Sequence, residues 1–572
     1  MVIKIIMENK EKNAFEQINE CIDKNKSFIL EAGAGSWKTY TLIQTIQHLL
    51  KIQSNDFLKN WQKIACITYT NTAKDELIER LDYNELVEIN TIHEFLWSII
   101  NNYQVNLKKE LLIYNETFDS DKIVENLESI LDNKDVIYTW KYWRNFEKWI
   151  LHHDDVIYLS IKLLEKYPKL QQILIWKYPY FFIDEYQDTS KGFVEILLNI
   201  LESNKKQFLL WFFWDFMQKI YEKDTVWKIE DDNLQIIQKI ENYRSQKKVV
   251  KLINNIRKLD DDLIQIPQEI DDWSVKLYYS DTGTDNEEKY NIVKEKLEWD
   301  FEWNPRDNKI LVLSNTKISK DLWFNKLLQI FNTRFWGQNW NDRLKQKEEP
   351  YTSFLLDKVE KIIYLYNEKN YSEFFKLFWD EDFKINTLED RKKLKDLIIW
   401  LEKTREESIS AIFEYIYKNK ILVKSEKIIL FEKRILEDLE EWKQKEKQEK
   451  DKKFQDELMN LNYKEIINYN QFLEKKTPYS TQHWTKWAEY KNVLLVIDDN
   501  PRWSFYNRFW KVINWEKLYK NSPNEDRDRR KHINLLYVSI SRAKENIVIL
   551  HLNNDNIEWW ERIIWEENIE KI

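Results

Sequence analysis

The chain has 572 residues, a formal net charge of -9 at pH 7 and two cysteines. At about 150 residues per domain this length predicts three to four domains, and Cys21 and Cys66 are too few for a disulfide framework or for a zinc or iron-sulfur site. The sequence lacks an apolar run near the roughly 18 residues of a membrane span, and its N-terminal apolar stretch is too short for an export signal. We therefore expect a cytoplasmic protein with no membrane partner.

The predicted elements alternate between strands and helices along the chain. Phe28 to Leu30 predicts a strand, which a tight loop joins to a helix with leucines at helical spacing. Further apolar runs of strand length are 64–68, 180–183, 208–213, 311–313, 493–497 and 547–550. Such alternation predicts an α/β fold with parallel sheets. Two segments rich in Lys, Glu, Leu and Ile, at about 97–170 and 325–470, predict helical insertions.

The first motif with a chemical meaning follows the first predicted strand. It has the spacing of a Walker A loop and reads Ala32-Gly33-Ala34-Gly35-Ser36-Trp37-Lys38-Thr39. In such a loop backbone N-H groups surround phosphates, Lys38 reaches the β- and γ-phosphates, and Thr39 holds Mg²⁺. One position departs from the pattern, because Trp37 stands where a small glycine is normally required.

The second motif closes the apolar strand at 180–183 with acidic residues. It reads Asp184-Glu185-Tyr186-Gln187-Asp188-Thr189. In this arrangement Asp184 would hold Mg²⁺ and Glu185 would face the attacking water. A lone Asp-Glu pair could equally be a helix cap, but the longer string is more specific.

The two motifs together resemble the UvrD/Rep-type superfamily 1A DNA helicases, and other segments match that family's motifs in the same order. These segments are Thr68-Tyr69-Thr70-Asn71-Thr72-Ala73, Thr91-Ile92-His93, 214–221, Asn242-Tyr243-Arg244-Ser245, 481–490 and 535–544. Each segment alone has an ordinary reading as packing, capping or surface residues. Their common order is what makes coincidence implausible.

The resemblance implies roles for residues around ATP and Mg²⁺. Gln17 would read the adenine, Tyr243 would stack on it, and Glu489 would hold the sugar. The residues expected to act on the γ-phosphate are Gln218 as its sensor, Arg244, and Arg542 as an arginine finger. The residues expected to contact DNA are Thr68, Tyr69, Thr70, Asn71, Thr91, His93, Tyr221 and His483.

Glycine is scarce in this chain and tryptophan is abundant. An average chain of this length holds about 40 glycines, whereas this one holds 5 glycines and 27 tryptophans, which add to 32. Trp37, Trp214 and Trp487 stand where the family motifs have Gly. This favours the hypothesis that the host reads UGA codons as glycine, and that the printed sequence translates the same codons as Trp. The alternative is a tryptophan-rich protein whose phosphate loop is inactive.

By resemblance, the RecA-like P-loop NTPase domain 1A comprises 1–96 and 171–240, insertion 1B 97–170, domain 2A 241–324 and 471–572, and insertion 2B 325–470. The implied activity is ATP-dependent movement 3' to 5' on single-stranded DNA with unwinding of duplex. Single-stranded and partly duplex DNA are the expected partners, with repair or recombination proteins. The alternatives are a non-hydrolysing ATP-dependent DNA-binding protein and the helicase subunit of a nuclease-helicase complex.

Overall fold

The structure is a computed structural model. It describes residues 13–572 except for 120–122, 133, 140–143, 206, 221–228, 230, 262, 270–273, 282–285, 302–307, 313–314, 336–343, 345–346, 348, 379–386, 421, 438–441, 475, 487, 498–524 and 553–556. The chain divides into two compact units. The first comprises Met1–Thr284, Lys486–Lys491 and Asp498–Ile572, and the second comprises Asp285–Thr485 and Asn492–Ile497.

A six-stranded sheet forms the centre of the first unit. Its strands follow the order β3-β2-β6-β7-β1-β8, and each neighbouring pair runs parallel. The strands are β1 (Ser27–Ala32), β2 (Ile64–Thr68), β3 (Val87–Thr91), β6 (Tyr180–Asp184), β7 (Leu209–Trp214) and β8 (Leu234–Lys239). Because parallel strands place their carboxyl ends at one edge, the loops after β1, β6 and β7 lie close together there.

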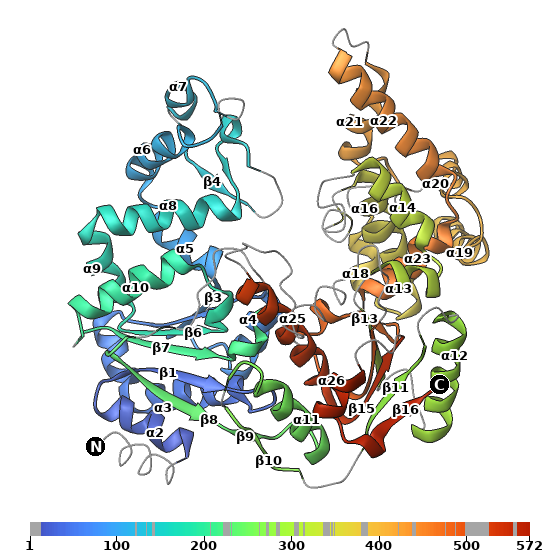
Figure 1. Ribbon diagram of the computed structural model, residues 1–572. Coiled ribbons are helices and arrows are strands. Elements are labelled where there is room, and N and C mark those ends of the chain that lie inside the picture. The colour runs from blue at the N-terminus through green and yellow to red at the C-terminus, as the bar shows by residue number, and fades with distance from the viewer. Residues whose placement is uncertain are drawn as a thin grey trace. The chain divides into compact units, whose positions relative to one another are not determined.

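Helices cover both faces of this sheet. Phe28 and Leu30 of β1 pack on one face with side chains of α2, α3 and α4, whereas Ile29 packs on the other with side chains of α5, α8 and α10. Figure 1 shows α2 and α3 on one side of the sheet and α8 and α10 on the other. These helices are α2 (Ala14–Asp23), α3 (Lys38–Asn60), α4 (Asn71–Arg80), α5 (Ile92–Ile100), α8 (His153–Lys166) and α10 (Lys191–Ser203).

The segment predicted as the first helical insertion contains helices and a short sheet. The helices are α6 (Gln104–Asn115), α7 (Leu127–Leu131), α8 and α9 (Pro168–Lys177). The two short strands β4 (Ile137–Tyr138) and β5 (Ile150–Leu151) pair in parallel, which the helical periodicity did not predict. The first unit also contains α11 (Lys247–Arg257), α25 (Glu525–Ile540), α26 (Ile557–Ile563), β9 (Glu241–Asn242), β10 (Ile266–Pro267), η2 (Tyr186–Asp188) and η3 (Phe216–Gln218).

The chain forms a second six-stranded sheet in the order β13-β12-β14-β15-β11-β16. β11 runs parallel to β15 and β16, and β12 runs parallel to β13 and β14. The strands are β11 (Val275–Tyr279), β12 (Asn308–Val312), β13 (Tyr479–Thr481), β14 (Tyr490–Ile497), β15 (Ala543–His551) and β16 (Ile569–Lys571). Two parallel sheets of six strands confirm the predicted α/β class with two RecA-like sheets.

The second unit is otherwise mostly helical between β12 and β13. Its helices are α12 (Asn286–Phe301), α13 (Asn315–Asp321), α14 (Asn325–Arg334), α16 (Pro350–Phe354), the π-helix η4 (Leu355–Glu360), α17 (Lys361–Asn367), α18 (Tyr371–Lys376), α19 (Leu388–Lys403), α20 (Ile409–Lys418), α21 (Glu426–Leu436), α22 (Trp442–Met459) and α23 (Tyr463–Leu473). Of the helices in the described part of the chain, none has both the length and the apolar character needed to cross a membrane.

Candidate nucleotide-binding site

A cavity of about 600 Å³ lies in the first unit at the carboxyl ends of β1, β6 and β7. This volume is within the range of small-molecule and cofactor sites. Its lining includes Gly33, Gly35, Ser36, Trp37, Lys38, Thr39, Thr70, Asp184, Glu185, Asp215, Gln218, Arg244, Lys486, Glu489 and Arg542. The structure therefore brings seven of the separate sequence segments together at one place.

The predicted phosphate loop connects β1 to the N-terminus of α3. Gly35 has a φ of +78°, and a Cβ there would lie 2.8 Å from Asn242 Oδ1, whereas a Cβ on Gly33 would lie 2.3 Å from Gln265. The Ala34 carbonyl accepts hydrogen bonds from Asn242 Nδ2 and from Gln265 Nε2, both at 2.9 Å. Glycine is therefore required at Gly35, by its φ and by the close approach of Asn242, whereas a side chain at Gly33 would require Gln265 to move. The N-terminal amides of α3 face the same cavity and suit an anion.

Lys38, the first residue of α3, contacts the two carboxylates that end β6. Its Nζ lies 3.4 Å from Asp184 Oδ1 and also pairs with the Glu185 carboxylate. Burial raises the pKa of Asp184 to about 6, although Lys38 opposes the shift. Burial also acts to raise the pKa of Glu185, but Lys38 and Lys486 outweigh it, so the net shift is downward. Glu185 is thus held as a carboxylate, the form that a general base requires.

The backbone at Glu185 is unusual for a residue with a side chain. Its φ is +53°, in the left-handed region, and the side chain is buried. Non-glycine residues adopt this region at an energetic cost and cluster at functional sites.

Asp184 and the Thr39 hydroxyl line the same cavity and provide the hard oxygen ligands that Mg²⁺ prefers. The donor set present therefore fits the predicted metal.

Two arginines from different segments reach the cavity. Arg542 is buried, and in the described part of the chain its guanidinium donates only to carbonyl and hydroxyl oxygens, those of Val538, Lys486, Ala488 and Ser541. Burial, and then the charge of Arg244, lower the pKa of Arg542 to about 9. Arg244 donates from Nε to Glu489 at 2.8 Å. A buried arginine with neutral acceptors is suited to gain a phosphate anion as its partner.

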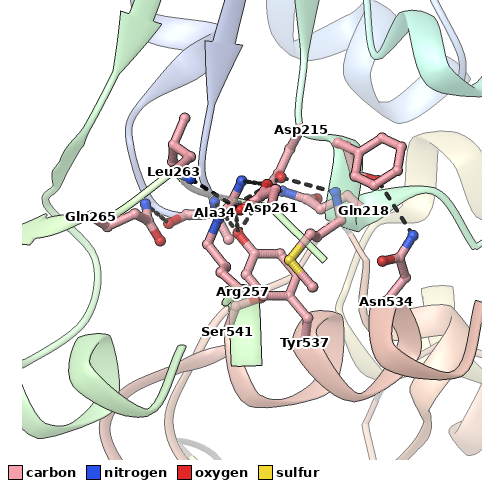
Figure 2. Close-up of polar contacts among 12 residues, drawn as sticks. Ala34, Asp215, Gln218, Arg257, Asp261, Leu263, Gln265, Asn534, Tyr537 and Ser541 are labelled. Atoms are coloured by element: carbon pink, nitrogen blue, oxygen red, sulfur yellow. Dashed lines mark hydrogen bonds and ion pairs between the residues drawn. The ribbon is translucent and has the colours of Figure 1, made fainter. Parts of the chain in front are cut away.

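The loop after β7 carries the predicted γ-phosphate sensor. Gln218 ends η3, lines the cavity, and donates from Nε2 to Asp215 Oδ2 at 2.9 Å. Figure 2 shows Gln218 beside Asp215, with Tyr537 of α25 and Arg257 of α11 on the other side of the carboxylate. The sensor is therefore attached to a network of buried polar groups.

Trp37 lies against the residue predicted to stack on adenine. The Trp37 indole stacks on the Tyr243 ring at a centroid distance of 4.6 Å, and Trp37 rather than Tyr243 belongs to the described lining of the cavity. Gln17 is buried on α2 and also lies outside that lining. The Glu489 carboxylate is paired with Arg244 and Lys544. The roles of these residues toward a nucleotide stay predictions.

The residues predicted to contact DNA lie mainly at the ends of two neighbouring strands. Thr68 of β2 is in register with Thr91 of β3. Tyr69 is 37 % exposed and Asn71 is exposed, whereas Thr70 caps α4 by accepting from the Ala73 amide. Thr91 caps α5 in the same way, so its hydroxyl already has a structural role.

His93 packs against a second histidine in this region. Its ring centroid lies 4.5 Å from that of His153, which Tyr138 contacts through its hydroxyl at 2.6 Å. Tyr221 and Trp487 lie outside the described residues, and of His483 only the backbone, in a short helix, is described. The DNA roles of His93, Tyr221 and His483 stay predictions.

Several residues of the site were not singled out from the sequence. Lys486 and Asp188 form an ion pair in which both side chains are fully buried. Gln265 supports the phosphate loop, and Arg257 and Tyr537 support Asp215. Tyr537 and Lys486 stand inside recognised motifs and could have been found there, but Arg257 and Gln265 belong to no motif.

Tryptophan is prominent among residues with left-handed backbone. Within the described residues twelve non-glycine positions have a positive φ, and four of them are tryptophans, at φ of +56° to +59°. They are Trp37, Trp61, Trp149 and Trp323. A bulky side chain is disfavoured there by about 1–2 kcal/mol, and glycine is the residue that adopts this region freely. Trp214 is different: it is buried on Tyr186 with its indole N-H lacking an acceptor among the described residues.

The sequence of this chain is similar to a family model and to several known proteins. A family model described as an AAA domain matches residues 16–224. Gabija protein GajB from Bacillus cereus (strain HuB5-5) is 26% identical over 96% of this chain and 97% of its own length. ATP-dependent DNA helicase Rep from Buchnera aphidicola subsp. Baizongia pistaciae (strain Bp) is 29% identical over 40% of each chain. ATP-dependent DNA helicase PcrA from Staphylococcus aureus (strain Mu50 / ATCC 700699) is 24% identical over 47% of this chain and 43% of its own.

Proposed function

The chain is related to the UvrD/Rep-type superfamily 1A helicases, and from this premise we propose that it hydrolyses ATP to move along single-stranded DNA and unwind duplex. One observation carries the proposal: a single cavity holds the phosphate loop, the Asp184-Glu185 pair, Gln218 and two arginines from different segments. These are the groups that phosphoryl transfer to water requires.

Each group would act on a different part of the reaction. Lys38 and the α3 amides would bind the β- and γ-phosphates, and Glu185 would accept a proton from the attacking water. Arg244 and Arg542 would stabilise negative charge on the transferring phosphoryl group. Mg²⁺ held by Thr39 and Asp184 would neutralise the phosphates when bound.

The nucleic-acid part of the proposal has a separate basis. It is supported by the two helicase relatives named above and by the exposed Tyr69, an aromatic ring that can stack on a base. We extend it to movement 3' to 5' and to a role in DNA repair or recombination. The division into domains 1A, 1B, 2A and 2B belongs to the same proposal, as does a helicase subunit of a nuclease-helicase complex as the alternative assembly.

The proposal includes glycine at Trp37, Trp214 and Trp487 in the protein as its host makes it. The left-handed backbone at Trp37, Trp61, Trp149 and Trp323 supports this recoding. Peptide mass spectrometry of the protein from its host, over residues 26–44 and 477–491, tests it directly. Tryptophan at 37 and 487 would refute the recoding and favour the non-hydrolysing alternative, in which Trp37 covers Tyr243.

The function is tested by phosphate release with and without single-stranded DNA. We expect DNA to stimulate ATP hydrolysis, and Glu185→Gln to reduce it by at least about 100-fold while ATP-dependent DNA binding persists. Unchanged hydrolysis in Glu185→Gln would refute its role as the base. Unwinding of duplexes with either a 3' or a 5' single-stranded tail tests the polarity, and unwinding from the 5' tail alone would contradict it.

A further inference from the structure

A buried arginine outside the recognised motifs, Arg257, lies at the end of α11 beside the phosphate loop. Its side chain is 3% exposed. Its Nη1 donates to Asp215 Oδ1 at 3.1 Å and its Nε donates to Asp261 Oδ1 at 3.0 Å. Burial acts to lower the pKa of Arg257, but Tyr537, Asp215 and Asp261 outweigh it, and the net shift is upward. The guanidinium is therefore charged and fixed between two carboxylates.

The hydroxyl of Tyr537 is fully used in hydrogen bonds. It accepts from Arg257 Nη1 at 2.8 Å and from the Ala34 backbone N-H at 2.8 Å, and it donates to Asp215 Oδ2 at 2.9 Å. A phenol has one proton and two lone pairs, so these three bonds exhaust its capacity. Figure 2 shows this hydroxyl between Ala34, Arg257 and Asp215. The position of Ala34 in the phosphate loop thus depends on the same group as the carboxylate of Asp215.

Asp215 extends the network to the cavity. Besides Arg257 and Tyr537, its carboxylate accepts from Gln218 Nε2 at 2.9 Å and from the Met217 amide at 3.2 Å. Hydrogen bonds to an ionised group are stronger and more directional than neutral ones. A continuous chain of bonds therefore joins the phosphate loop to the predicted γ-phosphate sensor, and Arg257 is its buried cation.

We propose that Arg257 is a positioning residue that holds Tyr537 and Asp215, so that Ala34 and Gln218 keep a fixed relative position around the γ-phosphate. The inference rests on the proposed ATP hydrolysis at this cavity. Without the guanidinium, Asp215 would be a buried carboxylate that lacks its nearest cation. Gln218, which is hydrogen-bonded to this carboxylate, would then lose its fixed position, and hydrolysis would slow more than ATP binding would weaken.

The test compares Arg257→Gln with Lys258→Gln, which removes the exposed cation next to it in sequence. The parent is the full chain with Trp37→Gly, Trp214→Gly and Trp487→Gly, assayed with single-stranded DNA. For Arg257→Gln we expect kcat to fall by about tenfold or more while KM for ATP changes by less than about threefold. Arg257→Lys should recover part of kcat because an ammonium can still pair with Asp215. Lys258→Gln should match the parent.

A double variant separates positioning from general damage to the fold. If Arg257 acts through Gln218, adding Arg257→Gln to Gln218→Ala should not lower kcat further, whereas multiplied losses would overturn the proposal. Should Arg257→Gln fail to fold in thermal unfolding, the same cycle is run with Arg257→Lys. An inactive parent would overturn both this inference and the proposed function. If the parent hydrolyses ATP and Arg257→Gln leaves kcat unchanged, this inference alone is overturned.

Discussion

The indole of Trp37 stacks on the ring of Tyr243, with centroids 4.6 Å apart and planes 25° from parallel. Tyr243 is the residue predicted to stack on adenine. The Trp37 indole and an adenine would therefore compete for one face of the Tyr243 ring. Displacing an aromatic pair costs about 0.5–1.5 kcal/mol. Trp37 also has left-handed backbone at a φ of +58°, at the N-cap of α3.

We therefore expect Trp37→Gly to tighten ATP binding by up to about tenfold, because it frees the Tyr243 ring for the adenine. Equilibrium titration with a fluorescent ATP analogue measures the change. Trp61→Gly, which removes an exposed indole at the other end of α3, serves as the control and should leave the affinity unchanged. Weaker binding in Trp37→Gly would contradict the assignment of Tyr243.

The recoding hypothesis also makes a prediction about stability. Trp61 is 82 % exposed at the C-cap of α3 with a φ of +56°, where a side chain gains little and strains the backbone. Trp61→Gly should raise the free energy of unfolding by about 1 kcal/mol. Trp176→Gly, at an exposed position inside α9, should lower it by up to about 1 kcal/mol. Urea unfolding of both variants measures the contrast, and a loss of stability in Trp61→Gly would count against recoding.

Most of the strands that the sequence did not predict in the two six-stranded sheets lie at a sheet edge. In the first sheet they are β3 and β8, the two edge strands, in which buried side chains are mixed with partly or fully exposed ones. The predicted strands β2, β6 and β7 are buried throughout and read as continuous apolar runs. In the second sheet the edge strands β13 and β16 were also missed, as was the inner strand β11.

The candidate site was predictable to the extent that its residues stand in motifs. Lys38, Glu185 and Gln218 could be named because a short spacing carries their chemistry. Arg257 and Gln265 reach the phosphate loop from segments with no such spacing, so only the fold brings them there. The covering of Tyr243 by Trp37 was equally beyond prediction, since it depends on two side-chain orientations.

The buried pair of Lys486 and Asp188 should contribute to stability only as a pair. Both side chains are 0% exposed, so Lys486→Met alone leaves a buried carboxylate and should cost about 3–5 kcal/mol. Adding Asp188→Leu to Lys486→Met should recover part of this loss, because Asp188 then leaves no unpaired carboxylate, although Glu185 still lacks the charge of Lys486. Urea unfolding of the single and double variants gives the coupling energy.

The matched control for that cycle is the exposed pair of Lys162 and Glu165, 2.8 Å apart and each nearly half exposed. Its coupling should be below about 1 kcal/mol. A coupling for Lys486 and Asp188 as small as that of the exposed pair would mean that water reaches the buried pair.

His93 should make stability depend on pH. Burial, and then the neighbouring His153, lower its pKa from 6.5 to about 4, although Asp154 and Glu94 act in the opposite direction. The folded chain thus holds His93 neutral, whereas the unfolded chain protonates it near pH 6.5. The contribution of neutral His93 to the free energy of unfolding is fully present above pH 6.5 and is lost as the pH falls toward 4. Its upper bound is about 3 kcal/mol.

Replacing the titrating ring should remove this contribution to the pH dependence. We expect the unfolding temperature of the chain with His93 to fall more steeply between pH 7 and 4.5 than that of the His93→Gln variant. Glutamine retains a polar side chain of similar size but cannot bind the proton. His48→Gln on α3, outside the histidine cluster, controls for the loss of a histidine as such. An equally steep fall in His93→Gln would show that other groups titrate in this range and that the ring of His93 is protonated in the folded chain as readily as in the unfolded one.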